Sequence, residues 1–154
     1  MLHNILVLFW LKIPVFSKHL KSFYFKFLIN LSFNSFEAWN GLPGPYIKWF
    51  DVTVKAGGMV KMLEAYENKK AYSESRLAFT MGIDKPIYTF SGRTYGKIVQ
   101  AHNPNGTWTS IFQADGYDKT YDQLDLHTKS LTSERKPSVE QFKSFILNRE
   151  YLQD

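Results

Sequence analysis

The chain has 154 residues and no cysteine, and its 19 Lys and Arg residues exceed its 14 Asp and Glu residues, giving a formal net charge of +5. This length predicts one domain, and 44% hydrophobic and 17% aromatic residues supply a core, which excludes a disordered or collagen-like chain. The lack of cysteine excludes disulfide frameworks, thiol nucleophiles and cysteine-ligated metal sites, and it fits a cytoplasmic location.

The basic residues form no run of like charges and match no nucleic-acid-binding motif. We therefore interpret the positive charge as a solvated surface and expect no nucleic-acid partner.

The first 40 residues differ from the rest, because they are rich in aromatic and basic residues and contain a single acid, Glu37. The apolar run at residues 5–11 is too short to cross a bilayer, which takes about 20 apolar residues. We divide the chain into an aromatic and basic N-terminal segment, residues 1–30, and an α/β domain, residues 31–154. Three interpretations of the segment stay open: a peripheral membrane contact, an irregular segment packed on the domain, or residues that are not the natural start of the domain.

Helices and strands alternate after residue 40, which predicts a mixed α/β domain. A helix is expected from Pro45 until Gly57 and Gly58 interrupt it, and a second helix at residues 59–66. The following pattern predicts a strand at 71–81, a β-hairpin with strands at 87–90 and 95–101 around a turn at 91–94, and a second turn at 103–106.

The last predicted element is a helix near the C-terminal end of the chain. Ser138 and Gln141 have the spacing of a capping box, and Val139, Phe142 and Phe145 recur with a helical period. Together with the preceding elements this completes an α/β pattern.

Most catalytic templates are absent from the sequence. The four histidines form no i,i+4 pair, and the acids at residues 115–125 lack the spacing of a calcium loop. The segment at residues 41–50 is different, because two glycines and two prolines precede a helix that carries Lys48, an arrangement suited to an anion. An ordinary tight loop is the competing interpretation.

Three segments in the same order resemble the inosine/xanthosine triphosphate pyrophosphatases, which hydrolyse non-canonical purine nucleoside triphosphates such as ITP, dITP and XTP to monophosphate and pyrophosphate. They are GLPGPYIKWF at 41–50, FSGRTYGKIV at 90–99 and FQADGYDKTY at 112–121, and the likeness covers residues 31–147. The resemblance implies an elongated α/β fold with a mixed sheet, a Mg²⁺-dependent hydrolase and a homodimer.

The resemblance also implies substrate-binding residues, one position at a time. Lys48 matches a substrate-contacting lysine, and Trp108 matches the Trp of the family's Phe-Gly-Trp-Asp motif. Lys129 matches a lysine upstream of the family's Ser-His-Arg triplet, and Ser133 and Arg135 match the Ser and Arg of that triplet, which holds the purine.

The chain departs from the family at several positions. Nothing in residues 1–30 matches the first strand and the phosphate loop, and either Phe27–Ile29 or Asn30–Ser32 stands where the family has Glu-Asp-Thr. Thr109 replaces an Asp of the family. Glu134 replaces the His of the triplet, and this acceptor disfavours inosine.

No catalytic residue and no Mg²⁺ ligand is assigned. Glu37 and Asp51 are candidates to replace the missing metal-binding acids. The alternative is an inactive, truncated relative that binds nucleotide or pairs with an intact subunit.

Overall fold

The computed structural model describes residues 27–148, so the predicted membrane contact of the N-terminal segment lies mostly outside the described residues. A five-stranded open sheet has the order β2-β1-β3-β4-β5. Its strands are β1 (Phe27–Phe36), β2 (Pro43–Gly44), β3 (Lys70–Thr80), β4 (Ile87–Ile98) and β5 (Phe112–Ala114). The helices are α1 (Ile47–Thr53), α2 (Lys55–Leu63), α3 (Leu126–Thr132) and α4 (Arg135–Leu147), with three-residue 3-10 helices η2 (Glu37–Trp39), η3 (Trp108–Ser110) and η4 (Tyr121–Gln123).

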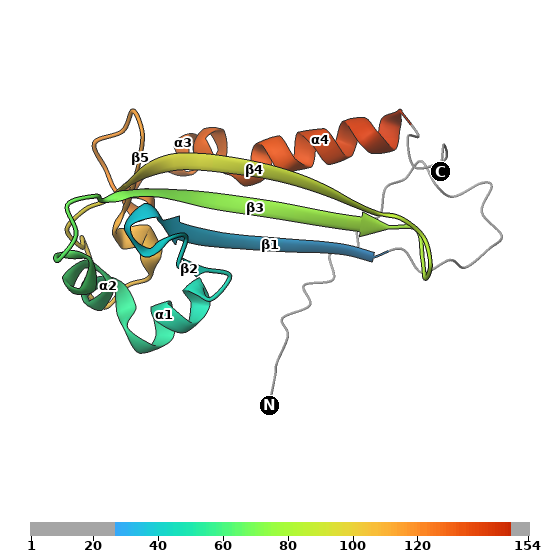
Figure 1. Cartoon of the computed structure of the whole chain (residues 1–154). Coiled ribbons are helices and arrows are strands. Elements are labelled where there is room, and N and C mark those ends of the chain that lie inside the picture. Colours follow the sequence, from blue (N-terminus) through green and yellow to red (C-terminus); the bar gives the residue numbers. More distant parts are fainter. Residues whose placement is uncertain (1–26, 149–154) are drawn as a thin grey trace.

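The three long strands β1, β3 and β4 give the described part an elongated outline (Figure 1). Helix α4 runs along β4, whereas α1 and α2 gather at the end where β1 finishes and β3 begins (Figure 1). The predicted boundary between residues 30 and 31 falls inside β1. None of the helices within residues 27–148 has the length and apolarity that a bilayer span requires.

The α/β class that the sequence predicts is confirmed. All strand pairings within residues 27–148 are antiparallel, so the mixed strand directions that we expected are not found in this part. Strands β3 and β4 follow each other through the short connection at residues 81–86, and parallel neighbours would need a much longer crossover.

The predicted hairpin turn at residues 91–94 is wrong. Strand β4 passes through these residues without interruption, and the reversal lies at residues 81–86. Gly92 has another function there, because a Cβ at this position would overlap the backbone oxygen of Glu134. The glycine lets the start of α4 approach the sheet closely.

The predicted interruption of the first helix at Gly57 and Gly58 is also wrong, since both lie inside α2. The break comes earlier, between α1 and α2, where Lys55 has a φ of 61°. A Cβ at Gly57 would lie 3.0 Å from the Pro104 side chain, and the Gly57 N–H donates to the Pro104 carbonyl at 2.9 Å. Gly57 therefore allows α2 to pack on the turn at 103–106, and this predicted turn is confirmed.

The final helix is present, but Ser138 does not cap it. Helix α4 begins at Arg135, and Ser138 is buried one turn inside it. Its hydroxyl lies 3.3 Å from that of Ser75 on β3 and donates to the Arg135 carbonyl at 2.9 Å. The capping-box hydrogen bonds instead occur at Thr120 and Gln123 around η4.

The apolar core lies at the end of the sheet that carries α1 and α2. Its fully buried side chains include Phe36, Met59, Leu63, Ile111 and Phe112. This core holds α1, α2 and η3 against the sheet, and it thereby sets the positions of Lys48 and Trp108.

Candidate functional site

Trp108 lies at the start of η3, and its backbone is hydrogen-bonded to a side chain of α1. The Trp108 backbone N–H donates to the Asp51 carboxylate at 2.8 Å. Burial raises the pKa of Asp51 above its ordinary value, and this hydrogen bond opposes the increase. The contact fixes η3 to α1, so the indole has a defined place relative to the helix that bears Lys48.

The Trp108 indole stacks on the ring of Tyr121 in η4. The ring centroids are 5.8 Å apart and the planes are inclined by 29°. Phe112 contacts both rings, with its centroid 5.9 Å from Trp108 and 6.0 Å from Tyr121. Three aromatic rings from η3, β5 and η4 therefore form one unit with the indole partly exposed.

Lys129, Ser133 and Arg135 lie around the junction between α3 and α4. The Lys129 ammonium donates to the Asp122 carbonyl at 3.1 Å, and the Arg135 guanidinium Nε donates to the Ser32 hydroxyl at 3.2 Å. The Ser133 hydroxyl accepts from the Arg135 N–H at 3.2 Å. The junction thus places the Arg135 guanidinium beside the Ser32 hydroxyl of β1 and the Lys129 ammonium beside η4.

Glu134 is buried at this junction, with 3% of its surface exposed. Its carboxylate lies 3.8 Å from the Arg135 guanidinium. A carboxylate only accepts hydrogen bonds when it is ionised, so Glu134 places an acceptor beside the Arg135 guanidinium.

The Tyr121 hydroxyl connects the aromatic rings to this junction. It donates to the Lys129 carbonyl at 3.4 Å. Burial raises the pKa of the Tyr121 phenol, and the nearby side chains of Thr132 and Ser133 oppose that increase. The structure therefore brings Trp108, Lys129, Ser133 and Arg135 into one neighbourhood through a residue to which the sequence analysis gave no function.

Lys48 lies on α1, away from the α3–α4 junction, and is connected to Trp108 only indirectly. It is exposed on α1, three residues before Asp51, and residues at this spacing are neighbours on a helix surface. Asp51 in turn contacts Trp108, so Lys48 is linked to the aromatic unit by one helix and one hydrogen bond. Its side chain is exposed to solvent.

Small polar side chains lie between the sheet and the α3–α4 junction. Asn34 and Ser73 face each other across β1 and β3, and both are buried. Within residues 27–148, no group forms a hydrogen bond with the Asn34 amide or the Ser73 hydroxyl. The neighbouring Thr94 donates to the Thr132 carbonyl at 2.5 Å, which anchors the junction to β4. The layer beneath the junction is consequently polar, unlike an ordinary core.

The described residues do not fit a Mg²⁺ site. No group of three or more His, Asp or Glu side chains able to hold a metal ion occurs among residues 27–148. The two candidate replacement acids are engaged elsewhere: Asp51 accepts from Trp108, and Glu37 accepts from the Asn68 amide at 3.0 Å. We therefore assign no ligand and derive no step through the metal.

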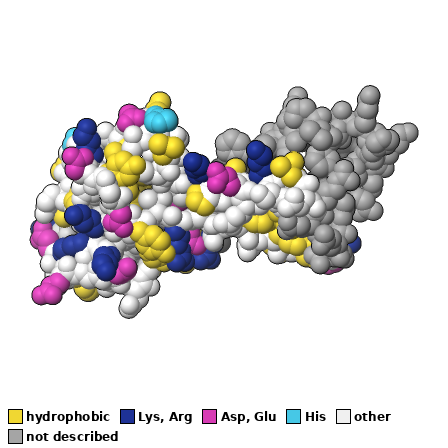
Figure 2. Space-filling view, turned by 90° about the horizontal axis from the view of Figure 1, so that it is seen from above, with side chains coloured by type: hydrophobic (Ala, Val, Ile, Leu, Met, Phe, Trp, Pro, Cys, Tyr) yellow, Lys and Arg dark blue, Asp and Glu magenta, His cyan; other side chains and the backbone are white. Residues whose placement is uncertain are grey.

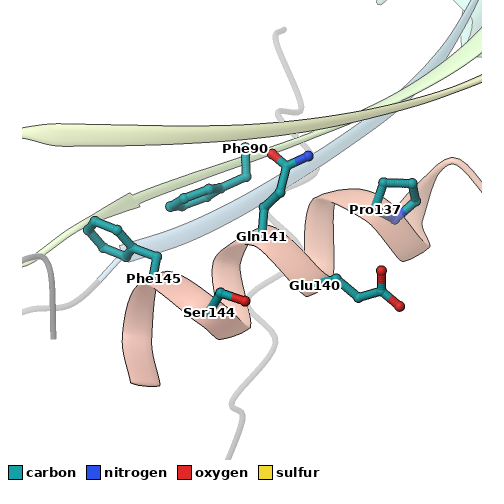
Figure 3. A pocket seen from close by; sticks show the side chains of 6 residues that line it. All are labelled: Phe90, Pro137, Glu140, Gln141, Ser144 and Phe145. Carbon is teal, nitrogen blue, oxygen red and sulfur yellow. The ribbon is translucent and has the colours of Figure 1, made fainter. Parts of the chain in front are cut away.

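An open hollow of about 570 Å³ lies between α4 and the first half of β4. Figure 3 shows Gln141 and Phe145 projecting from α4 toward Phe90 of β4, and Pro137, Glu140 and Ser144 of α4 complete the lining. The Gln141 amide donates to the Ser91 carbonyl at 3.0 Å. None of the predicted site residues lines this hollow, so it is separate from the neighbourhood of Trp108 and Arg135.

Acidic and basic side chains are interspersed at the end of the molecule that carries α1 to α3, as Figure 2 shows from above. The positively charged side chains of the candidate site are thus not part of a broad positively charged patch on this face.

A sequence model described as the Ham1 family matches residues 27–145. The chain belongs to the Ham1 family. The inosine triphosphate pyrophosphatase of Scheffersomyces stipitis is 42% identical over 115 residues, which are 74% of this chain and 59% of that protein. The enzyme of the same name from Candida albicans is 39% identical over 115 residues, 74% of this chain and 57% of that protein. The predicted resemblance is confirmed, although the chain spans less than two thirds of either relative.

Solved Ham1 proteins share the fold. The Staphylococcus aureus Ham1 protein matches with a TM-score of 0.70 at 20% identity, covering 90% of this chain and 84% of that chain. The HAM1 protein of Coxiella burnetii matches with a TM-score of 0.71 at 20% identity, covering 80% of this chain and 68% of that chain. These matches confirm the elongated α/β fold of the family.

Three residues that support the site, Tyr121, Asp51 and Ser32, were not predicted from the sequence in that function. Tyr121 closes a motif quoted for the family resemblance, but only its three-dimensional contacts show that it joins two parts of the site. For Asp51 the only signal was its charge. Ser32 stands at the position of the family's Glu-Asp-Thr in one alignment, but no local pattern indicates its contact with Arg135, which is 103 residues away.

Proposed function

We propose that this Ham1-family protein hydrolyses non-canonical purine nucleoside triphosphates, with ITP, dITP and XTP as the substrate class, to monophosphate and pyrophosphate. The observation that supports it best is the gathering of Trp108, Lys129, Ser133 and Arg135 around Tyr121, in a chain whose similar proteins include inosine triphosphate pyrophosphatases. We place the activity in the cytoplasm, as a homodimer or paired with an intact family member; light scattering after size exclusion tests the dimer.

The chemistry of the assigned residues suits a purine nucleotide. A partly exposed indole offers a face on which a base can stack, and such stacking contributes about 1–3 kcal/mol per base. The Arg135 guanidinium and the Ser133 hydroxyl supply hydrogen-bond donors for a keto oxygen. Lys48 and Lys129 supply positive charge for phosphate oxygens.

Glu134 alters the expected base preference. Its buried carboxylate accepts hydrogen bonds and repels a keto oxygen, so it lowers the preference for inosine relative to bases that carry amino donors. Replacement of Glu134 by Gln supplies an amide donor and should shift the preference toward ITP.

The expected reaction depends on Mg²⁺ by family resemblance, which stands as a proposal without assigned ligands. When bound, the metal would polarise the triphosphate and neutralise its charge. The described residues contribute the binding of base and phosphate.

The deciding experiment measures Mg²⁺-dependent pyrophosphate release from ITP, dITP, XTP and GTP by the purified chain. We expect release that Arg135→Ala reduces by about tenfold or more, because the guanidinium is lost from the base site. Exposed Lys136, the next residue of α4, offers the matched control Lys136→Ala, which should leave the rate unchanged.

A second function is favoured by one observation, the lack of a metal-holding group of acids within residues 27–148. In this second proposal the chain binds purine nucleotide without hydrolysing it. Binding of inosine monophosphate by a folded chain that releases no pyrophosphate would establish this second function and contradict the first. Absence of both release and binding would overturn both.

A further inference from the structure

Tyr121 occupies the point where two parts of the candidate site meet. Its ring stacks on Trp108 and contacts Phe112, while its hydroxyl donates to the Lys129 carbonyl. The ring is only partly buried, and its phenol lies near the side chains of Thr132 and Ser133. One side chain therefore touches both the aromatic unit and the α3–α4 junction.

The two parts it joins are otherwise anchored to different elements. Trp108 is tied to α1 through Asp51, and its element packs on the apolar core. The junction is tied to the sheet, through Thr94 on β4 and through Ser32 on β1. Tyr121 links these two anchored groups from η4, whose own start is fixed by the capping box of Thr120 and Gln123.

We propose that Tyr121 is a positioning residue that sets the spacing between Trp108 and the Lys129–Arg135 segment, so that one purine contacts both. This inference deepens the proposed function and rests on it. A tyrosine suits this purpose because its rigid ring has few torsions, and because the stacked ring and the hydroxyl constrain two different neighbours.

The physical consequence is specific to the base. Stacked aromatic pairs contribute about 0.5–1.5 kcal/mol beyond the burial of their area, and this contribution here holds the indole plane. If the indole tilts or the junction moves away, a purine can satisfy only one of its two sets of contacts. Affinity then falls although each contacting residue is still present.

The experiment compares the binding of inosine monophosphate by the full chain and by Tyr121→Phe and Tyr121→Leu, using calorimetry. We expect Tyr121→Leu to weaken binding about tenfold and Tyr121→Phe to recover most of the loss, because it keeps the stacked ring. Tyr66→Leu is the matched control, since Tyr66 is 44% exposed in the loop after α2, and it should bind as the parent does.

Hydrogen exchange of the backbone amides provides a second measurement that needs no ligand. Tyr121→Phe removes the hydroxyl that holds the Lys129 carbonyl, so we expect faster exchange confined to residues 129–135. Tyr121→Leu should add faster exchange in η3 because it also removes the stack.

The outcomes separate this inference from the proposed function. If the parent chain binds neither inosine monophosphate nor guanosine monophosphate, whose base carries an amino donor for Glu134, the proposed base site is wrong, and the exchange pattern alone decides the positioning by Tyr121. Unchanged binding in Tyr121→Leu overturns the inference. Faster exchange throughout the protein in Tyr121→Phe also overturns it, because it shows a general structural contribution.

Discussion

The two ends of α4 contact the same sheet through different chemistry. At its first turn, α4 meets β3 and β4 through small polar residues, with Ser138 against Ser75 and Gly92 below the Glu134 carbonyl. At its last turns it meets them through aromatic rings, where Phe145 lies 4.5 Å from Tyr88 and 5.2 Å from Phe90 between centroids.

Under the proposed function, this difference separates stability from ligand binding along one helix. Aromatic rings bury large apolar areas, so they secure the far end of α4. Small polar residues allow a close approach and leave polar groups near Ser133 and Arg135, as the buried Asn34 and Ser73 side chains illustrate. The first end supplies the site with donors, and the second end holds the helix in place.

The largest effect is expected at the aromatic end. Phe145→Ala should lower the free energy of unfolding by about 3–5 kcal/mol, because it opens a cavity among Phe79, Tyr88 and Phe90. Urea denaturation followed by circular dichroism measures the change. Leu147→Ala is the control, since Leu147 is 70% exposed and should cost little. Equal losses in the two variants would contradict the claim that the aromatic contacts of Phe145 secure this end of α4.

A smaller effect is expected at the polar end. Gly92→Ala places a Cβ against the Glu134 carbonyl and should destabilise the protein by about 1–3 kcal/mol through overpacking. It should also displace the Arg135 side of the junction and weaken nucleotide binding more than Phe145→Ala does at temperatures where both variants are folded. Ser91→Ala, at an exposed neighbouring position, serves as the control. A stable Gly92→Ala protein with unaltered binding would show that the close approach is unnecessary.

The smallest effect concerns Asp51 and depends on pH. Burial raises the pKa of Asp51 in the folded protein above its unfolded value, so the folded state holds the proton more tightly. The stability from this site is therefore full below the unfolded pKa and is lost as the pH rises through the folded pKa.

Asp51→Asn keeps an oxygen acceptor for the Trp108 N–H and removes this titration. Its midpoint of thermal unfolding should equal or exceed that of the parent at pH 7, and the difference should shrink as the pH falls through the carboxyl range. Asp51→Ala should be less stable than Asp51→Asn by about 1 kcal/mol, since it loses the hydrogen bond. A parent chain more stable than Asp51→Asn at pH 7 would refute this account.

Several elements could be predicted because their patterns are local. The strand at 71–81 was predicted within one residue at each end, and the turn at 103–106 follows from the Asn and Gly that it needs. The helix near the C-terminal end was predicted from its apolar period, but its start was not. Serine is a common helix cap, but Ser138 contacts Ser75 on β3, and the local sequence pattern does not indicate this contact.

Two glycines were predicted wrongly because glycine often marks a turn or a helix end. Gly92 lies inside strand β4 and Gly57 inside helix α2, and at each position a neighbouring segment comes too close for a side chain. A sequence records the small residue but not the neighbour that requires it.

The sequence by itself determined the α/β class, the family and the residue types of the candidate site, because ordered motifs and the period of apolar residues are local properties of the chain. Only the tertiary structure decided that Tyr121 joins Trp108 to the α3–α4 junction and that the Asp51 carboxylate accepts a hydrogen bond from η3. Those contacts depend on how the sheet places separate segments side by side. Such distances are set by packing over the whole domain, which no single stretch of sequence contains.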